Sequence, residues 1–417
     1  MTAMNPSFEQ LLHDEVRAAR VQPRLLPRGE CVDTRDRRCG LCLRGTLPYD
    51  IEEAIKRRAI ARFWKAGAYG GRLDDLVPSP AGREYRTVSK RRVFRHGRAV
   101  VLGLIDRSRN GITPVPVIRC AVEPEAHNAV YRIIQHELLR ERFAPLAAAM
   151  RYAIVKGMPP TCFVLLNVGS VAPEIVRVSN QLSKILTGAI PAVAGIFLVA
   201  GGDDDQFYMG KAGGSDPRRL RKLFGASELA TVVGGRPYRF SPASFSQVNQ
   251  QMLDVFVGQV RALLEPGGQT SLIDLYCGYG LFALSLAPSY RRVTGVEISQ
   301  QSIHAARMNA TRQKAAHVRF IRSPITGETI GGLLKGLDER DAVLLDPPRN
   351  GTEPEVIETI AERRPATVVH VFCNPDVIAP ELARWRRGGY QIVRAVPLDM
   401  FPGTSIFEML VALRPRT

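Results

Sequence analysis

Residues 271–287 read SLIDLYCGYGLFALSLA, and this stretch decides the class of fold. A short apolar run that contains Asp274 leads into a turn with two glycines, Gly278 and Gly280, and then into a second apolar run. Glycine allows left-handed backbone conformations and lets the backbone approach a ligand closely. The stretch therefore predicts a strand, a ligand-binding turn and a helix, which together form the first unit of an α/β sheet.

The chain from about residue 244 onward repeats this alternation. We expect a helix over 244–264 and strands at 271–275, 292–297, 317–322, 341–345, 367–372 and 391–396, followed by a last strand, Ile406–Leu413, that comes after a loop. This pattern predicts a Rossmann-like, doubly wound and mostly parallel sheet over residues 236–417.

The chain before this sheet has a different pattern. Helical periodicity appears at 7–20 and 50–65, and residues 84–122 alternate as antiparallel strands do. A strand–helix–strand unit follows between Cys162 and Ala200. We therefore predict an α+β domain over 29–235, preceded by an N-terminal segment over 1–28.

Charge is unevenly distributed along the 417 residues. The net charge is +17, and residues 1–125 hold 24 Lys and Arg against 15 Asp and Glu, a surplus of nine. A basic N-terminal part favours a polyanionic partner, nucleic acid before membrane, over the simpler alternative of an arginine-rich composition. The uncharged run Ile185–Gly202 is interrupted by Pro191 and glycines, which favours a helix end and a buried strand over a membrane span. No secretory leader is recognisable, so we expect a cytoplasmic protein without a membrane partner.

Four polar side chains follow the predicted strands at the same edge of the sheet. Asp274, Glu297, Asp346 and Cys373 all lie at or just past the carboxyl end of a strand. Ligands of open α/β sheets bind beyond these carboxyl ends. We therefore expect all four side chains to contribute to one site.

The glycine turn and Glu297 predict the kind of cofactor. Glu297 follows Gly278 by 19 residues, where a carboxylate can accept hydrogen bonds from ribose hydroxyls. A dinucleotide fingerprint requires a third glycine three positions after Gly280, and Ala283 stands there. S-adenosylmethionine (SAM) therefore fits the pattern better than NAD.

Cys373 is the candidate nucleophile, in the stretch VFCNP (371–375). Asn374 and Pro375 favour a turn that would lift the thiol toward the cofactor, although many cysteines are simply inert core residues. A thiol beside a methyl donor suits a substrate carbon that is not itself nucleophilic, such as C5 of uracil. Thiolate addition at C6 activates C5, and a base must later remove the C5 proton.

The C-terminal half resembles the SAM-dependent RNA uracil-C5 methyltransferases. The matching segments are FSPASFSQVNQ (240–250), IDLYCGYGLFALSLA (273–287), GVEISQQSIHAARMNA (295–310), LLDPPRNG (344–351), FCNPDVIAPEL (372–382) and VPLDMFPGTSIFEMLVAL (396–413). The resemblance implies that Cys373 is the nucleophile and Glu408 the base. It also implies SAM-site roles for Gln247, Tyr276, Glu297 and Asp346, beside the two turn glycines.

Three positions depart from the family pattern. Leu281 stands where Asn is usual beside the cofactor, Ile406 where a His commonly precedes the base by two residues, and Pro324 where an acid often faces the adenine. The nucleophile is intact, so these departures bear on SAM affinity and substrate choice more than on the type of reaction.

Cysteines gather in the N-terminal part at Cys31, Cys39 and Cys42, with Cys120 further on. Four thiolates suit either zinc or an iron–sulfur cluster, and their spacing leaves both open. The segment CGLCLRGTLPYDIEEAIKRRAI (39–60) resembles the iron–sulfur motif of the same family, which implies a 4Fe–4S cluster.

The resemblance also extends to the RNA partner. Arg86 and Lys90 match the family's RNA-contacting stretch, although a solvated basic strand would look the same. The segment before Cys31 is too short for the small β-barrel (TRAM domain) that many members carry. A cluster without this barrel is typical of a branch that acts on large-subunit (23S) ribosomal RNA.

The expected activity is therefore the synthesis of 5-methyluridine in RNA through a covalent adduct of cysteine with C6, by a monomeric enzyme. Three alternatives stay open: transfer RNA as the substrate, methylation of cytosine at C5, and a catalytically impaired RNA-binding paralogue that keeps the cluster.

Overall fold

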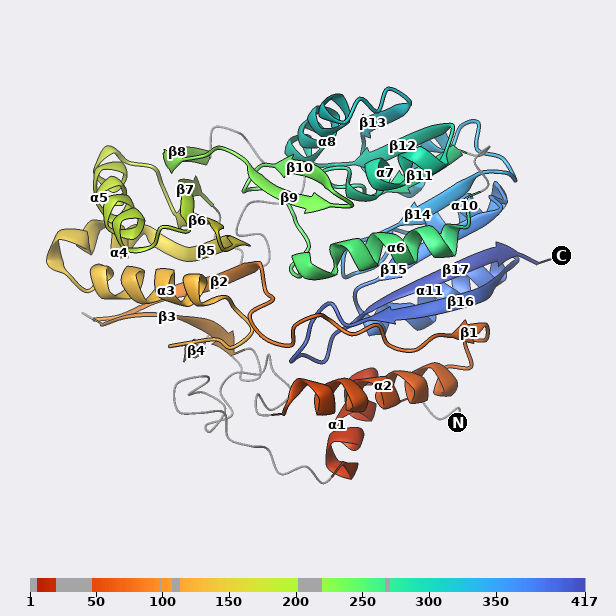
Figure 1. Ribbon diagram of the computed structural model, residues 1–417, viewed down its shortest axis with the longest axis horizontal. Helices are drawn as coiled ribbons and strands as arrows, with labels where there is room; N and C mark the ends of the chain where they lie inside the picture. Colours follow the sequence, from red (N-terminus) through yellow and green to blue (C-terminus); the bar gives the residue numbers. More distant parts are fainter. Residues whose placement is uncertain are drawn as a thin grey trace.

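The structure is a computed structural model that describes residues 6–19, 47–97, 99–106, 113–201, 220–266 and 271–416. Cys31, Cys39 and Cys42 lie outside the described residues. Two sheets lie next to each other, one from the middle of the chain and one from its C-terminal part (Figure 1). No helix among the described residues is long and apolar enough to cross a membrane.

The C-terminal sheet has eight strands in the order β1-β16-β17-β15-β14-β11-β12-β13. Their bounds are Arg72–Leu73, Tyr390–Leu398, Glu408–Pro415, Thr367–Phe372, Ala342–Leu345, Ser271–Leu275, Arg292–Glu297 and Val318–Arg322. All neighbouring strands are parallel except that β17 runs antiparallel to both β15 and β16. Every residue of β14 and β15 is buried, as is typical of strands covered on both faces.

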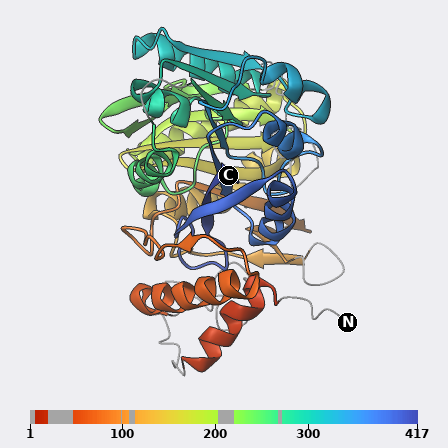
Figure 2. The same cartoon turned by 90° about the vertical axis from the view of Figure 1, so that its right-hand side faces the viewer.

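Helices cover both faces of this sheet and confirm the doubly wound α/β prediction. One core joins the sheet to α6 (Leu253–Leu264), α7 (Leu281–Leu286) and α8 (Gln300–Arg312). The other joins it to α1 (Phe8–Ala18), α2 (Tyr49–Ala66), α9 (Gly327–Leu333), α10 (Val356–Glu362) and α11 (Pro375–Arg387). Helices α1 and α2 therefore pack against the C-terminal sheet although they precede the central one (Figure 2).

The expectation of a helix over 244–264 was wrong for its first part. Residues 241–249 form a loop, a single 3₁₀ turn η4 (Gln250–Met252) follows, and the α-helix begins at Leu253. The Ser241 hydroxyl accepts a hydrogen bond from the amide of Ala243 at 3.2 Å. Such side-chain contacts with the backbone compete with helix formation.

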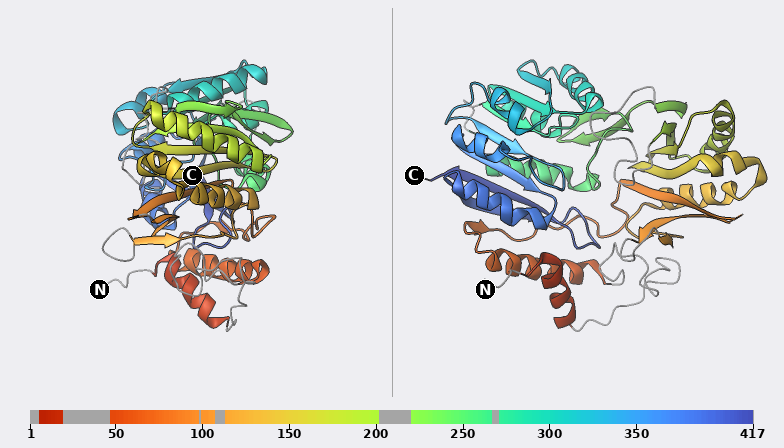
Figure 3. Two further views of the ribbon diagram at one scale, coloured as in Figure 1. Left: turned by 90° about the vertical axis from the view of Figure 1, so that its left-hand side faces the viewer. Right: turned by 180° about the vertical axis from the view of Figure 1, so that it is seen from behind.

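The central sheet has the order β4-β3-β2-β5-β6-β7-β8. Its strands are Thr113–Pro116, Ala99–Asp106, Val88–His96, Met150–Met158, Thr161–Val168, Val193–Ala200 and Leu220–Gly225. One face is covered by α3 (Glu125–Leu138), η2 (Glu141–Phe143), α4 (Ala144–Ala149) and α5 (Pro173–Ala189) (Figure 3). The other face shares a core with the C-terminal sheet and with the hairpin of β9 (Leu229–Val233) and β10 (Arg236–Phe240). Domain limits at 28/29 and 235/236 stay a proposal.

Candidate active site

Strand β17 brings Cys373 and Glu408 to the same place. In the antiparallel ladder of β15 and β17, Phe372 lies opposite Met409. Cys373 and Glu408 are the next residues beyond this pair, and Glu408 acts electrostatically on the thiol of Cys373. Two side chains that are 35 positions apart in sequence therefore meet at the carboxyl end of β15.

The Glu408 carboxyl group is buried and incompletely hydrogen-bonded. Its residue is 2% exposed, and its Oε2 atom has no hydrogen-bond partner among the described residues. Burial raises its pKa well above the usual range, and the nearby Asp346 raises it further, while Arg349 lowers it. The resting carboxyl group is therefore biased toward its neutral form.

Burial, Asp346 and Arg349 also affect the pKa of the Cys373 thiol. Burial raises its pKa to about 12, with smaller contributions in the same direction from Glu408 and Asp346 and an opposing one from Arg349. Asn374 caps α11 and donates a hydrogen bond from Nδ2 to the carbonyl of Arg349 at 3.1 Å. Arg349 lies in the stretch LLDPPRNG, from which no role was predicted for it. In the structure this cation acts electrostatically on both Cys373 and Glu408.

The glycine turn adopts the conformations that its residues predict. Gly278 and Gly280 have φ of +54° and +85°. Tyr276 also has a positive φ, +67°, although it is not a glycine, and its buried hydroxyl has no hydrogen-bond partner among the described residues. A side chain held in this sparsely populated region indicates local strain, which is often found at functional sites. A Cβ atom added at Gly278 would meet no atom within 4 Å, so open space lies beside this turn.

Glu297 at the end of β12 closes the same turn. Its Oε2 accepts a hydrogen bond from the amide of Gly278 at 3.2 Å, and its Oε1 accepts one from the amide of Ser299 at 2.7 Å. Burial raises its pKa. The carboxylate thus links the turn after β11 to the turn after β12 by hydrogen bonds. Ribose recognition was predicted at this position.

Asp274 lies behind the turn. Its Oδ2 accepts a hydrogen bond from the amide of Ala283 at 2.8 Å, and its fully buried Oδ1 has no partner among the described residues. Burial raises its pKa well above the usual range, and the amide of Ala283 opposes this, while Asp346 and Glu297 add to it.

Asp346 is close enough to act electrostatically both on Asp274, behind the glycine turn, and on Cys373 and Glu408. It raises the pKa of all three groups. Burial raises its own pKa to about 7. Its Oδ2 accepts a hydrogen bond from Nε2 of Gln247 at 3.4 Å. The carbonyl of Gln247 in turn accepts a hydrogen bond from the hydroxyl of Thr87 at 3.1 Å. The loop that carries Gln247 therefore connects the start of β2 to the rim, by which we mean the carboxyl ends of the C-terminal strands with Asp274, Glu297, Asp346, Cys373 and Glu408.

The three departures from the family pattern have different surroundings. Leu281 is 5% exposed and packs in the core, so it offers no polar group to a ligand. Ile406 is half-buried against the same core, and Pro324 is exposed at the end of β13. None of them supplies a polar side chain to the rim.

Three of the proposed RNA and metal residues, Arg86, Lys90 and Cys120, are described, and they lie on or near the central sheet. Lys90 lies on β2 with its ammonium 5.4 Å from the centre of the Tyr152 ring, and Arg86 donates from Nε to the carbonyl of Val88 at 3.1 Å. Cys120 is half-exposed just before α3, and its amide donates to Oδ1 of Asn128 at 2.8 Å. Among the described residues, no three His, Cys, Asp or Glu side chains are arranged to hold a metal ion.

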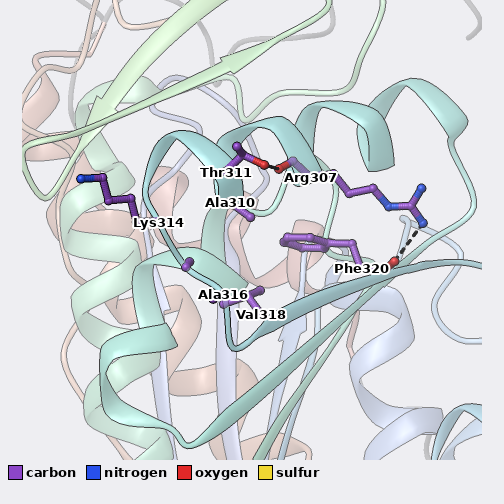
Figure 4. Close-up of a pocket in the computed structure, with 8 residues that line it drawn as sticks. Arg307, Ala310, Thr311, Lys314, Ala316, Val318 and Phe320 are labelled. Carbon is purple, nitrogen blue, oxygen red and sulfur yellow. Dashed lines mark hydrogen bonds between the residues drawn. The ribbon is translucent and has the colours of Figure 1, made fainter.

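A surface hollow of about 490 Å³ lies elsewhere (Figure 4). Its lining residues come from the C-terminal half of α8 and the strand that follows: Arg307, Ala310, Thr311, Lys314, Ala315, Ala316, Val318 and Phe320. Val318 is the first residue of β13, at the end of the sheet opposite to the rim. The hollow therefore contains none of the predicted site residues.

Comparison with known proteins agrees with this site. The family model described as tRNA (uracil-5-)-methyltransferase matches residues 231–416. An uncharacterized RNA methyltransferase of Listeria monocytogenes is 34% identical over 195 residues, which are 47% of this chain and 43% of that relative. One of Geobacter sulfurreducens is 27% identical over 367 residues, or 87% of this chain and 72% of the relative. The matched part thus spans less than half the length of the Listeria relative.

A solved structure resembles almost the whole chain. The tRNA (uracil-54, C5)-methyltransferase of Pyrococcus abyssi, determined with S-adenosyl-L-homocysteine, superposes with a TM-score of 0.66 at 19% identity, over 89% of this chain and 86% of that one. This likeness confirms the fold. The family match covers the glycine turn, the DPPR loop, Cys373 and Glu408. Residues 231–416 of the chain are therefore similar to the tRNA (uracil-5-)-methyltransferase family, and the resemblance to RNA methyltransferases extends over most of the chain in the Geobacter relative.

Proposed function

We propose that the protein methylates C5 of a uridine in RNA and uses SAM as the methyl donor. The observation that carries this proposal is the position of Cys373 next to Glu408, at a rim lined by buried acids. A nucleophile and a base side by side are what a C5 methylation requires, because C5 must first be activated and then lose its proton.

The rim fits a cationic cofactor with a ribose. Asp274, Asp346 and Glu408 are enclosed acids whose pKa values are raised, and oxygens of Asp274 and Glu408 lack partners among the described residues. Buried acids in such surroundings favour a positive charge nearby. SAM supplies a methyl group on a positively charged sulfur. We assign the ribose hydroxyls to Glu297, which accepts a hydrogen bond from the Gly278 amide in the glycine turn, and the orientation of Asp346 to Gln247, which donates to it.

The two reacting side chains act in succession. The thiolate of Cys373 adds to C6 of uracil, a C6–S bond forms, and the electron pair moves to C5. Bound SAM would supply the methyl group to C5, with cleavage of its S–CH3 bond and S-adenosylhomocysteine as the leaving group. The carboxylate of Glu408 then removes the C5 proton. The C6–S bond then breaks and the thiolate leaves. Arg349 lowers the pKa of both groups and therefore favours their reactive, charged forms.

We propose the surface of β2 around the half-exposed Lys90 and Arg92 as the RNA surface. Lys90 and Arg92 of β2 lie 5.4 and 6.0 Å from the centre of the Tyr152 ring. Cations beside aromatic rings suit a strand of RNA, whose phosphates and bases they contact. Arg86 lies at the start of this surface, and its backbone forms an isolated antiparallel β-bridge with Asn249, in the loop that carries Gln247. Ribosomal RNA as the substrate rests on the cysteine motif alone.

We further propose a 4Fe–4S cluster held by Cys31, Cys39, Cys42 and Cys120. Its support is the number of thiols and the half-exposed position of Cys120. Protein purified without oxygen should be brown and contain about four iron atoms per chain. A colourless protein with one zinc ion would contradict this assignment and leave the methyltransferase proposal intact.

The mechanism is tested with unmodified RNA and SAM labelled in the methyl group. Cys373→Ala should abolish both methylation and the covalent adduct. Glu408→Gln should accumulate a protein–RNA complex that survives denaturation and carries the label, because no base removes the C5 proton. Mapping 5-methyluridine in RNA from cells with and without the gene identifies the nucleotide. If Cys373→Ala protein still makes 5-methyluridine, the proposal is wrong.

A further inference from the structure

Helix α2 buries a complete ion pair against the loop that leads to Glu408. The side chains of Lys56 and Asp399 are 0% exposed, and Nζ lies 2.7 Å from Oδ1. Asp399 begins the loop between β16 and β17, and residues 399–407 form it. The pair joins positions that are 343 residues apart in sequence.

The ammonium of Lys56 holds both ends of this loop. Besides Asp399, it donates to the carbonyl of Phe401 at 3.2 Å and to that of Ile406 at 3.4 Å. An ammonium has three protons, and here each has one acceptor. Ile406 is two residues before Glu408, so Lys56 contacts the loop near both of its ends, next to the β16–β17 pair of Leu398 and Glu408.

Other side chains of α2 and its neighbours hold the same loop. The hydroxyl of Tyr49 donates to Oδ2 of Asp399 at 3.1 Å and accepts from the amide of Ser79 at 2.8 Å. Glu52 accepts a hydrogen bond from the amide of Gly403 in the middle of the loop. The loop is thus bound at its start, middle and end.

The Glu408 carboxyl group needs this support more than most carboxyl groups do. Its Oε2 has no partner among the described residues, and Ile406, which stands where the family commonly has a His, contributes no polar side chain. The backbone at the start of β17 therefore determines where the base lies. Buried ion pairs are seldom more stabilising than apolar residues of the same size, so stability alone does not explain this one.

We propose that Lys56 is a positioning residue for Glu408, through its contacts with both ends of the 399–407 loop. This inference rests on the proposed function, because it concerns the step in which the C5 proton is removed. Lys56 touches neither of the reacting groups, and it acts on the base alone. Its loss should therefore slow the release of methylated RNA and spare methyl transfer.

The test is the double variant Lys56→Met/Asp399→Asn, which removes both buried charges and keeps the side-chain volumes. In a single turnover, methyl transfer should stay within about threefold of wild type. Release of methylated RNA should slow by tenfold or more, so that the labelled adduct accumulates as it does in Glu408→Gln. Thermal unfolding verifies that the variant is folded. Glu52→Gln is the matched control, since it acts on the middle of the loop, and release should change by less than threefold.

Tyr49→Phe gives a milder variant that keeps both charges and removes only the hydroxyl contact with Asp399. It should slow release about threefold at an unchanged rate of methyl transfer, and it decides the question should the double variant fail to fold. Release at the wild-type rate in a folded variant, or an equal loss in transfer and release, overturns the positioning role. Wild-type protein that forms neither adduct nor 5-methyluridine overturns the proposed function and this inference together.

Discussion

Two regions of the molecule bury charged side chains in opposite ways. Between β2 and α3, Arg91 forms two hydrogen bonds with Glu123, Nη1 to Oε1 at 2.8 Å and Nη2 to Oε2 at 2.7 Å. At the carboxyl ends of the C-terminal strands, where the active site is proposed, Asp274 and Glu408 are buried just as completely, and each keeps one oxygen without a partner among the described residues. No cationic side chain forms an ion pair with either of them within the described part of the chain.

This difference separates structural from functional charges. A charge buried for structure is folded together with its counterion, because an unpaired charge in the interior is strongly destabilising. An acid buried without a counterion favours its neutral form, and a cationic ligand that binds next to it would favour the charged form. The rim therefore has the character of a site for a cationic ligand, while the β2–α3 pair has that of a core.

The largest effect is expected at the paired region. Glu123→Gln leaves the Arg91 charge buried and should lower the free energy of unfolding by about 3–5 kcal/mol. Glu125→Gln is the matched control, since its pairs with Arg119 and Arg132 are about half exposed and worth about 1 kcal/mol or less. Urea unfolding at pH 7 measures both. An equal loss for the two variants would break the comparison.

His127 makes the paired region sensitive to acid. Its Nε2 donates to the carbonyl of Gly157 at 2.8 Å, and its Nδ1 accepts from the Ser89 hydroxyl, which itself contacts Tyr131. Burial lowers its pKa from 6.5 to about 4; Arg91 adds to this, while Glu123 and the Gly157 carbonyl oppose it.

As the pH falls, His127 of the unfolded state binds a proton at about pH 6.5, before His127 of the folded state does. The contribution of the neutral imidazole to the free energy of unfolding is therefore fully present above pH 6.5 and is lost as the pH falls toward 4. This interval corresponds to roughly 3 kcal/mol. His127→Gln should flatten the dependence of the unfolding free energy on pH over this range. An unchanged slope would show that the imidazole is not buried in its neutral form.

At the rim, the expected effects are on ligand binding. Glu297→Ala removes a carboxylate that we assign to the ribose hydroxyls and should weaken SAM binding by about 1–3 kcal/mol. Calorimetry with SAM measures this change, and Glu328→Ala, an exposed acid of α9, serves as control. An unchanged dissociation constant would mean that another carboxylate binds the ribose.

The smallest expected effect is on the stability of a Glu408 variant, and it tests most directly whether this acid differs from the structural charges. Glu408→Gln should leave the unfolding free energy of the ligand-free protein unchanged or raise it by up to about 1 kcal/mol, because it removes an acid that has no counterion to lose. The same variant should accumulate the covalent adduct. A loss of more than about 2 kcal/mol would place Glu408 among the structural charges.

Local sequence was sufficient for the strand–turn–helix unit and for the residues at the strand ends. The run Ser271–Leu275, the two glycines after it and the carboxylate of Glu297 lie within one βαβ unit, where apolar runs and glycine conformations act over a few residues. Cys373 was found for the same reason, at the end of a buried strand. The helix expected from residue 244 begins only at Leu253, and in the loop before it the Ser241 hydroxyl binds the backbone amide of Ala243.

Tertiary structure alone decided how these pieces meet. The sequence offers Glu408 as an acid in an apolar strand, and only the antiparallel pairing of β17 with β15 brings it next to Cys373. The contact of Lys56 with Asp399 spans 343 residues and has no local signal, because α2 packs on a sheet formed some 200 residues later in the chain. Strand order and helix docking depend on burial of apolar surface across the whole molecule, whereas turns and strand ends depend on the backbone preferences of a few neighbouring residues.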